Sequence, residues 1–365
     1  MKLLAISKYV DGVNKKDSAV DLWRVKRPLR ELQKHVDWQI DFRPAIIEDF
    51  HGLEKDPDEF IRRYGGKLAE ELGQYDIIFT SYALFTSPHQ YAILWGAEHK
   101  YGTKLVVDID DDVRDVDPSN FLFWKSAGWQ GHFFLSRTTE VATRMVTTNQ
   151  KLADKLRMNS DVDPKLWVIP NYIADAYPDQ TIQSKDKVTI GFFGGASHYN
   201  DLHKSNVLPA LQKLMHEHKN VYFKSCGQPI DDYLPRKRIE LVETAQGSEW
   251  AEKRLPSMKL DIAIAPLLMT EFNQYKSNIK WQEATRVGAA FVGTNTGPYA
   301  DIPDGTALLT NNTTESWYDA LKTLLDAAVR KKQVRAAKKE LEGWKLENHW
   351  QEYKELLEEV HSEHN

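Results

Sequence analysis

Short apolar segments alternate with longer amphipathic segments along this chain, and the order repeats twice. In the first half, apolar runs predict strands at Lys2–Ser7, Val36–Phe42, Asp76–Ser81, Lys104–Ile109, Arg144–Thr148 and Leu166–Ile169. The amphipathic stretches between them predict helices at Leu22–His35, Asp56–Leu72, Gln90–Tyr101 and Asn149–Met158. Short strands separated by helices are typical of a parallel sheet that is covered by helices.

The same pattern restarts after a polar, proline-containing stretch at residues 175–186, which we interpret as a linker. Strands are predicted at Lys187–Phe193, Asn220–Ser225, Ile239–Val242, Leu260–Ala265 and Ala289–Thr294. Helices are predicted at Asn206–His218, Ser277–Val287 and Thr313–Val329, the last capped by Asn312 with Glu315 three residues on, and in the tail at 347–361.

The repeated pattern predicts an α/β protein with two Rossmann-like, doubly wound domains that face each other across a cleft. We place the first domain at residues 1–174, the second at 187–342 and a C-terminal helix at 343–365. In such folds ligands bind where the strands end, at their carboxyl termini.

Composition narrows the class of protein. The chain has 365 residues, of which 41% are hydrophobic and 28% charged, with 53 acidic against 48 basic side chains and a formal charge of −5. This balance disfavours a uniformly basic coat for nucleic acid but leaves a local basic patch open. The single cysteine, Cys226, cannot form an internal disulfide and fits a reducing compartment, so a cytoplasmic protein is expected. The apolar runs are too short to span a bilayer, so no integral membrane contact is expected.

The first segment with candidate chemistry runs from Gly191 to His198. Glycines at the end of a strand let backbone amides approach an anion, so Gly194 and Gly195, with His198 after them, could hold phosphates. The segment is neither a complete GxGxxG nor a Walker loop, which disfavours a dinucleotide or ATP site. The alternative is a tight turn that needs glycine only for its geometry.

A second candidate is the predicted helix that begins near Ser277. Lys276, Lys280 and Glu283 are spaced to share one of its faces, and two lysines at a helix N-terminus suit a diphosphate. A carboxylate about two turns into the helix could accept hydrogen bonds from sugar hydroxyls. An ordinary Lys280–Glu283 surface pair is the alternative.

Two loops follow apolar strands and could add to a site. The loop with Gly297, Pro298 and Tyr299 could offer further backbone amides to phosphate. In the first domain, Asp110, Asp111 and Asp112 repel one another unless a cation, a helix N-terminus or solvent offsets their charge. A magnesium site or a general base is one interpretation of this run, and a solvated capping loop is the other.

A basic stretch follows the first strand and includes Arg24, Arg27 and Lys34, which could contact phosphates of a donor or an acceptor. A solvated helix face is the alternative interpretation. The histidines at 89, 132, 198 and 203 are catalytic candidates by residue type alone.

Taken together, these segments resemble the GT-B glycosyltransferases, in particular the nucleotide-sugar-dependent enzymes called group 1. The stretch Leu166–Ile173 looks like the family's "viPNgvD" strand and turn, and Val146–Leu152 is similar to its "vvtvs…La" segment. In the second domain, Asp261–Leu267 looks like the strand before the donor site, and Lys276–Tyr299 looks like the donor-binding helix, strand and loop.

The resemblance implies a nucleotide diphosphate sugar as donor substrate, held mainly by the second domain. Glu283 matches the second glutamate of the family's E-x7-E motif, which holds the ribose, whereas Tyr275 stands at the place of the first. Lys276 or Glu271 could substitute for it. Gly194 and Gly195 match the glycine turn near the phosphates, and the loop at 297–299 matches the one below them.

The resemblance also implies a mechanism. Lys276 and Lys280 would neutralise the leaving diphosphate, so no cofactor is required, although magnesium is possible. The tail helix would cross back onto the first domain. A retaining outcome is expected; for inversion, Asp110, Asp111 or Asp112 would be the base, and Arg24 and Arg27 are the candidate acceptor contacts.

Three functions stay open at this point. The leading hypothesis is transfer to a hydroxyl of a glycan, lipid or protein acceptor. The second is transfer to a hydroxymethylated base of DNA, as in phage-type enzymes, which the basic stretch motivates. The third is a non-catalytic nucleotide-sugar-binding protein, motivated by the missing first glutamate.

Overall fold

The computed structural model describes residues 1–7, 19–44, 57–82, 88–120, 123, 129–158, 165–174, 186–230, 234–245 and 247–363. The chain divides into two compact units. The first comprises Met1–Arg114, Gly128–Tyr172 and Leu346–Asn365, and the second comprises Asp115–Ala127 and Ile173–Lys345. Residues 115–127, which the sequence assigned to the first domain, thus group with the second unit. Residues 175–185 of the predicted linker lie outside the described residues.

The first unit is built on a six-stranded parallel sheet with strand order β2-β1-β3-β4-β5-β6. Its strands are β1 (Lys2–Ser7), β2 (Gln39–Pro44), β3 (Ile77–Ser81), β4 (Lys104–Ile109), β5 (Arg144–Thr147) and β6 (Leu166–Val168). All six were predicted. β1, β3 and β4 are buried along almost their whole length, as strands covered on both faces must be, which is why their sequences are nearly continuous apolar runs.

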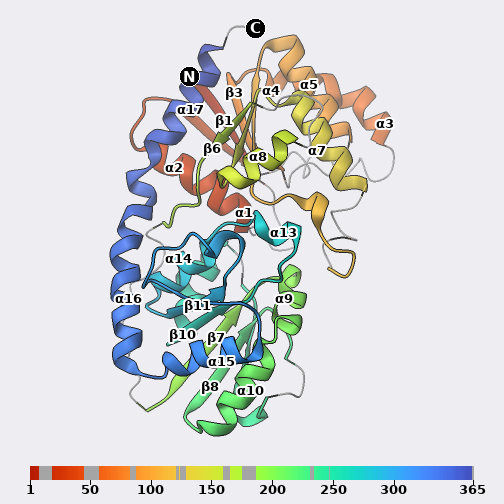
Figure 1. Ribbon diagram of the computed structural model, residues 1–365. Helices are drawn as coiled ribbons and strands as arrows, with labels where there is room; N and C mark the ends of the chain where they lie inside the picture. The colour runs from red at the N-terminus through yellow and green to blue at the C-terminus, as the bar shows by residue number, and fades with distance from the viewer. Residues whose placement is uncertain are drawn as a thin grey trace. The chain divides into compact units, whose positions relative to one another are not determined.

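Helices surround this sheet (Figure 1). They are α1 (Ala19–Asp21), η1 (Leu22–Lys26), α2 (Arg27–Gln33), α3 (Pro57–Phe60), η3 (Ile61–Gly65), α4 (Gly66–Leu72), α5 (Pro88–Tyr101), η5 (Val113–Asp115), α7 (Trp129–Val141), α8 (Gln150–Met158), η11 (Leu346–Asn348) and α17 (Trp350–Ser362). The sequence analysis missed α7, whose mixed composition gives little helical periodicity.

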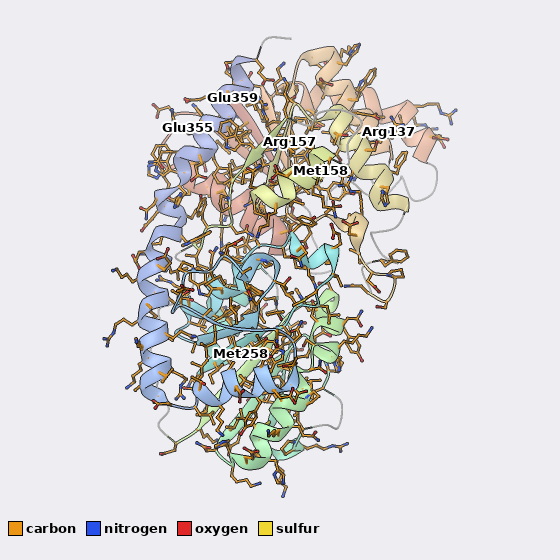
Figure 2. All side chains as sticks on the ribbon, in the orientation of Figure 1. Arg137, Arg157, Met158, Met258, Glu355 and Glu359 are labelled. Carbon is orange, nitrogen blue, oxygen red and sulfur yellow. The ribbon has the colours of Figure 1, made fainter. Side chains whose placement is uncertain are left out.

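The tail helix α17 belongs to the first unit and contacts α2 and β3, in agreement with the predicted return of the chain. Tyr353, Leu356 and Leu357 are at most 1% exposed on its inner face. Glu355 and Glu359, labelled in Figure 2, lie on its exposed face, and Glu359 accepts a hydrogen bond of 2.8 Å from Arg144 of β5. Burial of its apolar face therefore holds α17 on the first unit, and an ion pair joins its exposed face to β5.

The second unit repeats the architecture, with strand order β12-β11-β10-β7-β8-β9 and parallel pairing throughout. Its strands are β7 (Val188–Phe193), β8 (Val221–Cys226), β9 (Ile239–Val242), β10 (Ile262–Ala265), β11 (Ala290–Thr294) and β12 (Leu308–Thr310). Only β12 was not predicted, because three residues at the edge of a sheet give too short an apolar run.

The helical elements of the second unit cover both faces of the sheet. They are η6 (Ala196–His198), α9 (Tyr199–Lys204), α10 (Val207–Glu217), η7 (Arg236–Arg238), α11 (Gly247–Glu249), η8 (Trp250–Arg254), α12 (Leu255–Ser257), α13 (Glu271–Gln274), α14 (Ile279–Arg286), η9 (Gly297–Tyr299), α15 (Thr314–Thr323), α16 (Ala327–Leu341) and η10 (Glu342–Trp344).

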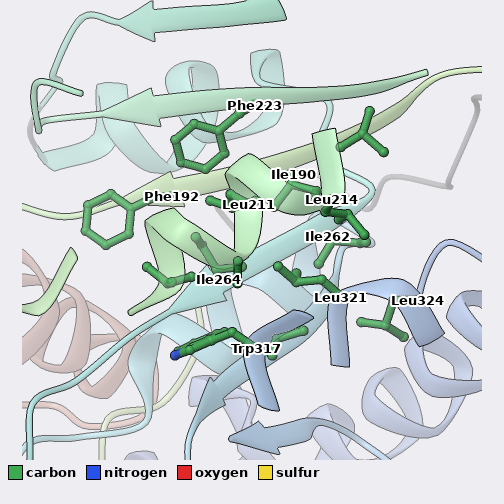
Figure 3. Packing of buried hydrophobic residues seen from close by; sticks show 14 of the residues in the cluster. Ile190, Phe192, Leu211, Leu214, Phe223, Ile262, Ile264, Trp317, Leu321 and Leu324 are labelled. Carbon is green, nitrogen blue, oxygen red and sulfur yellow. The ribbon is translucent and has the colours of Figure 1, made fainter. Parts of the chain in front are cut away.

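Apolar side chains of α10 and α15 pack on the central strands to form the core of this unit (Figure 3). Leu211, Leu214 and Leu321 are fully buried there beside Ile190 of β7. Trp317 is also fully buried, and its indole N–H donates to the Ser205 carbonyl at 3.0 Å. The core holds the strands in register, so the loops at their carboxyl ends have fixed positions.

The predicted helix 313–329 is two helices, and its predicted cap is wrong. Thr313, not Asn312, caps α15, through a capping box with Ser316. Asn312 lies at φ 63° and instead donates to the Leu267 carbonyl at 2.8 Å. Asp326 lies directly before α16, and its side chain accepts hydrogen bonds from the first amides of that helix, at 2.7 Å from Ala328 N. A side-chain acceptor within the run therefore stops one helix and starts the next.

Across the described ranges, no helix combines the length and the apolar character needed to cross a bilayer.

Candidate donor site at the strand ends of the second unit

The carboxyl ends of the parallel strands β7, β8, β10 and β11 meet at one edge of the second sheet. A glycine turn follows β7 at this edge. The Gly194 amide donates to the Cys226 carbonyl at 3.1 Å, and a Cβ at Gly194 would lie 3.0 Å from His198 Cβ. Gly227, at φ 87°, would place a Cβ 2.2 Å from the Gly194 carbonyl oxygen. The turn thus requires glycine at 227 and is tightly packed at 194.

Gly195 differs from its neighbour. A Cβ there would meet no atom within 4 Å, and the residue is exposed. Its carbonyl accepts from Gln228 Nε2 at 2.5 Å and from the His198 amide at 3.0 Å. The surroundings of Gly194 are therefore crowded, whereas the space beside Gly195 is open.

His198 forms a hydrogen-bonded pair with Asp201, three residues later. His198 Nδ1 lies 2.9 Å from Asp201 Oδ2, and their side chains are 12% and 4% exposed. Asp201 Oδ1 accepts from the Leu268 amide at 2.9 Å and from Asn273 Nδ2 at 2.8 Å. Although burial acts in the opposite direction, the hydrogen bonds from His198 and Leu268 lower the pKa of Asp201. The carboxylate is therefore charged and holds the imidazole in one orientation.

Two lysines border this pair. Lys280, in the first turn of α14, donates to the Phe193 carbonyl, and its ammonium lies 5.1 Å from the centre of the Phe193 ring. Burial lowers the pKa of Lys280 to about 8, with Lys276 adding to the effect and Glu283 opposing it. Lys276 Nζ lies 4.1 Å from the centre of the Phe272 ring. Both cations are thus held beside the glycine turn by carbonyl and aromatic contacts.

Burial, together with the charges of Lys280 and Lys276, lowers the pKa of His198 to about 4, against the pull of Asp201. His198 is therefore neutral near pH 7. Since its Nδ1 faces a carboxylate, the proton lies on Nδ1 and Nε2 can accept.

Glu283 lies one turn beyond Lys280 on α14 and is 6% exposed. Its Oε1 accepts from Trp250 Nε1 of η8 at 3.0 Å. This contact fixes one carboxylate oxygen. Asn278, with Ser277 before it, is the N-cap position of α14, and its side-chain oxygen accepts from Gln282 instead of capping an amide.

The loop after β11 contains Gly297, Pro298 and Tyr299. Gly297 lies at φ 51°, and a Cβ there would be 2.4 Å from the Asn273 carbonyl oxygen, so the loop packs tightly on α13. Tyr299 is 1% exposed, and its ring packs edge-on against Phe291 at 5.2 Å between ring centres. The side chain of Tyr299 therefore belongs to the core, not to the predicted donor contacts; Pro298 is partly exposed.

The predicted aspartate run lies in the first unit and divides into two kinds of residue. Asp110 and Asp111 are partly exposed, whereas Asp112 is 1% exposed. Both oxygens of Asp112 accept from Arg114, at 2.8 Å from Nε and 2.7 Å from the terminal nitrogen. This ion pair occupies Asp112, so Asp110 and Asp111 are the better candidates for a base.

Arg24 is 1% exposed in the first unit. It donates to both oxygens of Asp108, at 2.7 Å for the shortest contact, and to Pro170 O and Asn171 Oδ1, each at 3.1 Å. All three guanidinium nitrogens are thus used, which makes Arg24 a structural residue instead of the predicted acceptor contact. Arg27, partly exposed, lies 4.5 Å from the centre of the Trp23 ring.

Sequence reasoning missed three residues of this candidate site. Asp201 had a visible signal, the HxxD spacing that places two side chains on one side of a helical turn. Trp250 and Gln228 had none, since they reach the site from distant parts of the chain. The side chain of His89 is outside the described residues; His132 is exposed, and His203 faces the Pro229 carbonyl at 3.1 Å.

In the part of the chain that the structure describes, no three His, Cys, Asp or Glu side chains gather as a metal-binding group.

No protein-family model matches this sequence. No curated protein matches it either. Among solved structures, HepE from Anabaena in complex with UDP and glucose is similar with a TM-score of 0.66 and 11% identity, over 98% of this chain and 100% of that one. A sucrose-phosphate synthase from Thermosynechococcus elongatus has a TM-score of 0.66 and 13% identity, over 99% of each chain.

TarM from S. aureus is similar with a TM-score of 0.60 and 10% identity over 81% of this chain, which spans only 58% of TarM's length. At sequence identities this low, the similarity shows a shared fold and nothing more. The two parallel six-stranded sheets with their helices, matched over nearly the whole chain, show that this protein has the GT-B fold.

Proposed function

We propose that this protein is a glycosyltransferase that moves a sugar from a nucleotide diphosphate sugar to an acceptor hydroxyl. We assign donor binding to residues 187–342 and acceptor binding to residues 1–174, with a retaining outcome. The observation that carries the proposal is the group of Lys276, Lys280 and His198 around the glycine turn, with Glu283 one helical turn further.

Departure of a diphosphate requires stabilisation of its developing negative charge. The ammonium groups of Lys276 and Lys280 supply positive charge, and the N-terminus of α14 adds its dipole. Because the Phe193 carbonyl and two aromatic rings fix Lys280, little reorganisation is needed when the phosphates arrive. Magnesium is the alternative source of positive charge, and assays with and without EDTA distinguish the two.

Glu283 suits the ribose of the nucleotide. Trp250 holds one carboxylate oxygen, which leaves the other to accept from vicinal hydroxyls. The chain lacks the first glutamate of the E-x7-E motif, the usual contact to the donor sugar, because Tyr275 occupies that place. The Tyr275 hydroxyl donates to Glu271 Oε1 at 2.8 Å and so orients a carboxylate close in sequence to the missing one. We assign Glu271 the role of the substitute.

The acceptor hydroxyl would be activated from the first unit. A retaining enzyme of this group uses no dedicated base. If the enzyme inverts, Asp110 or Asp111 is the base to test, since Arg114 occupies Asp112. Arg27 remains the candidate contact to an acceptor phosphate.

The acceptor is a glycan, a lipid or a protein in our proposal. Modified DNA is less favoured, because Arg24 of the basic stretch is buried and Lys34 is paired with Glu31 at 2.6 Å, which reduces the positive charge that this stretch offers to a phosphate backbone. A gel shift with modified and unmodified duplexes at low salt tests this acceptor directly.

The comparisons support the donor class, since HepE was solved with UDP and with UDP-glucose. We place the protein in the cytoplasm, where a buried free thiol such as Cys226 stays reduced.

The testing experiment is a thermal-shift screen over nucleoside diphosphates and nucleotide sugars, followed by calorimetry on each hit. We expect stabilisation by one nucleoside diphosphate and by its sugar derivatives. If no nucleotide raises the unfolding temperature or releases heat on titration, the proposal is wrong.

A further inference from the structure

We propose that His198 takes up a proton when the donor binds and then donates its Nε2–H to an oxygen of the diphosphate. The inference rests on the proposed donor site and adds a proton to its binding equilibrium. No covalent step is involved: the proton comes from solvent, and the Nδ1–H bond to Asp201 is kept.

Two contacts hold the imidazole in the site, and a third holds the backbone just before it. Nδ1 lies 2.9 Å from Asp201, and the ring packs against the glycine turn, where a Cβ at Gly194 would be 3.1 Å from His198 Cδ2. Asn120 Nδ2 donates to the carbonyl of the preceding residue, Ser197, at 2.9 Å. Within the described part of the chain, Nε2 has no hydrogen-bond partner, which leaves this atom for a ligand.

Three charged groups act on the ring. Asp201 on α9 favours the protonated imidazole, whereas Lys280 on α14 and Lys276 just before that helix oppose it, and burial opposes it most. The free site therefore contains two cations and a third group, His198, that burial and the two cations keep neutral. A dianionic diphosphate reverses this balance, because it screens the lysines from His198 and adds negative charge of its own.

Neutral imidazole would place a lone pair of Nε2 against a phosphate oxygen, which is repulsive. Protonation converts the contact into a charge-assisted hydrogen bond. An opposite charge within a few ångströms raises such a pKa by about 1–3 units. The bound donor thus selects imidazolium, with Asp201 already placed to stabilise it.

Lys280 also titrates, and pH separates the two groups. The pKa of Lys280 is about 8, so at about pH 6 this lysine is already protonated, whereas His198, with a pKa of about 4, is not. Proton uptake at about pH 6 therefore reports on His198 and not on Lys280.

The test is calorimetric titration of the full-length protein with UDP-glucose at about pH 6 in buffers that differ in ionisation enthalpy. UDP-glucose is the probe because its diphosphate diester, unlike UDP, has no proton that titrates near neutrality. The slope of the observed heat against buffer ionisation enthalpy counts protons. We expect uptake of about 0.1–0.9 proton per UDP-glucose at about pH 6, because a nearby opposite charge moves the pKa of His198 from about 4 to between about 5 and 7.

His198→Gln should reduce the uptake to about zero and weaken binding more at about pH 6 than at about pH 8. His203→Gln is the matched control, since His203 lies on the next helical turn and faces a backbone carbonyl. It should keep the full uptake. If His198→Gln does not fold, the ring signals of His198 in the NMR spectrum of the wild-type protein replace it, and they should shift to imidazolium values with UDP-glucose.

Binding without proton uptake, or uptake that persists in folded His198→Gln, would overturn the inference while leaving the donor site intact. Absence of binding by UDP-glucose and by every other nucleotide sugar would instead contradict the proposed function. The two failures are therefore distinguishable.

Discussion

Lys280 is the side chain of the proposed donor site with the largest consequence for the pH dependence of binding. Its ammonium is held beside the end of β7 by the Phe193 carbonyl, and burial lowers its pKa to about 8. The lysine is thus near its titration point under mildly alkaline conditions, where an exposed lysine would be fully charged.

Donor affinity should fall as pH rises above about 8, by up to about tenfold per pH unit, since Lys280 loses its proton in the free protein. Stability should change in the opposite direction. Between pH 8 and 10.5 Lys280 holds a larger share of its proton in the unfolded chain than in the folded protein. Its contribution to the free energy of unfolding therefore rises as the pH increases across that interval. Calorimetry with UDP over a pH series measures the first effect. Lys280→Arg should flatten the profile, and an unchanged slope in that variant would contradict the assignment.

Glu283 is predicted to hold the nucleotide through its ribose. Glu283→Ala should raise the dissociation constant of UDP by about 10–100-fold, the loss expected for a hydrogen-bonded carboxylate contributing about 1.5–3 kcal/mol. The exposed Glu315 provides the control, and Glu315→Ala should bind as the wild type does. Wild-type affinity in a folded Glu283→Ala protein would remove this residue from the site.

At the scale of elements, the turn between β7 and η6 depends on its neighbour after β8. Gly227 at φ 87° faces the Gly194 carbonyl so closely that any side chain there displaces the turn. This turn positions His198, and it also positions the end of β7, where Lys280 contacts the Phe193 carbonyl. A substitution at Gly227 therefore acts on donor binding without touching the donor.

Gly227→Ala should lower the free energy of unfolding by about 1–3 kcal/mol, the range for strained backbone, and weaken UDP binding as well. Gly195→Ala is the matched variant, because a Cβ there meets nothing within 4 Å. It should leave stability unchanged. Chemical denaturation of the two proteins side by side decides the point; equal stability would show that the close contact carries no strain.

For the whole molecule, the tail helix completes the first unit from the far end of the chain. Leu357 is fully buried, and Glu355 two residues before it is exposed on the same helix (Figure 2). Leu357→Ala should cost about 2–5 kcal/mol of stability, whereas Glu355→Ala should cost little. UDP affinity, which we assign to the second unit, should change less than twofold in both folded variants. A large loss of affinity in Leu357→Ala would contradict this division of roles.

The sequence predicted most of this fold, because strands buried on both faces give continuous apolar runs that need no knowledge of tertiary contacts. It could not predict β12, whose three residues pair only because β11 lies beside them. Nor could it find the break before α16, since Thr313–Val329 keeps helical periodicity across it, and only the backbone contacts of Asp326 reveal the start of a new helix.

Within the site, prediction succeeded where spacing along one element decided proximity, and failed where distant segments meet. Lys280 and Glu283 share α14, so their neighbourhood follows from the sequence. The contact of Trp250 with Glu283 joins residues 33 positions apart, and no local sequence pattern predicts it. Arg24 was misread because its charge was visible, whereas its buried partner Asp108, 84 residues away, was not.

The most direct test of the central claim is release of nucleoside diphosphate from a nucleotide sugar by the purified protein, with EDTA present and an acceptor or water as the second substrate. The account predicts release with at least one nucleotide sugar that stabilises the protein, reduced at least about tenfold in Lys280→Met. Tight binding of such a donor with no release under any acceptor condition would contradict a transferase and leave a binding protein in its place.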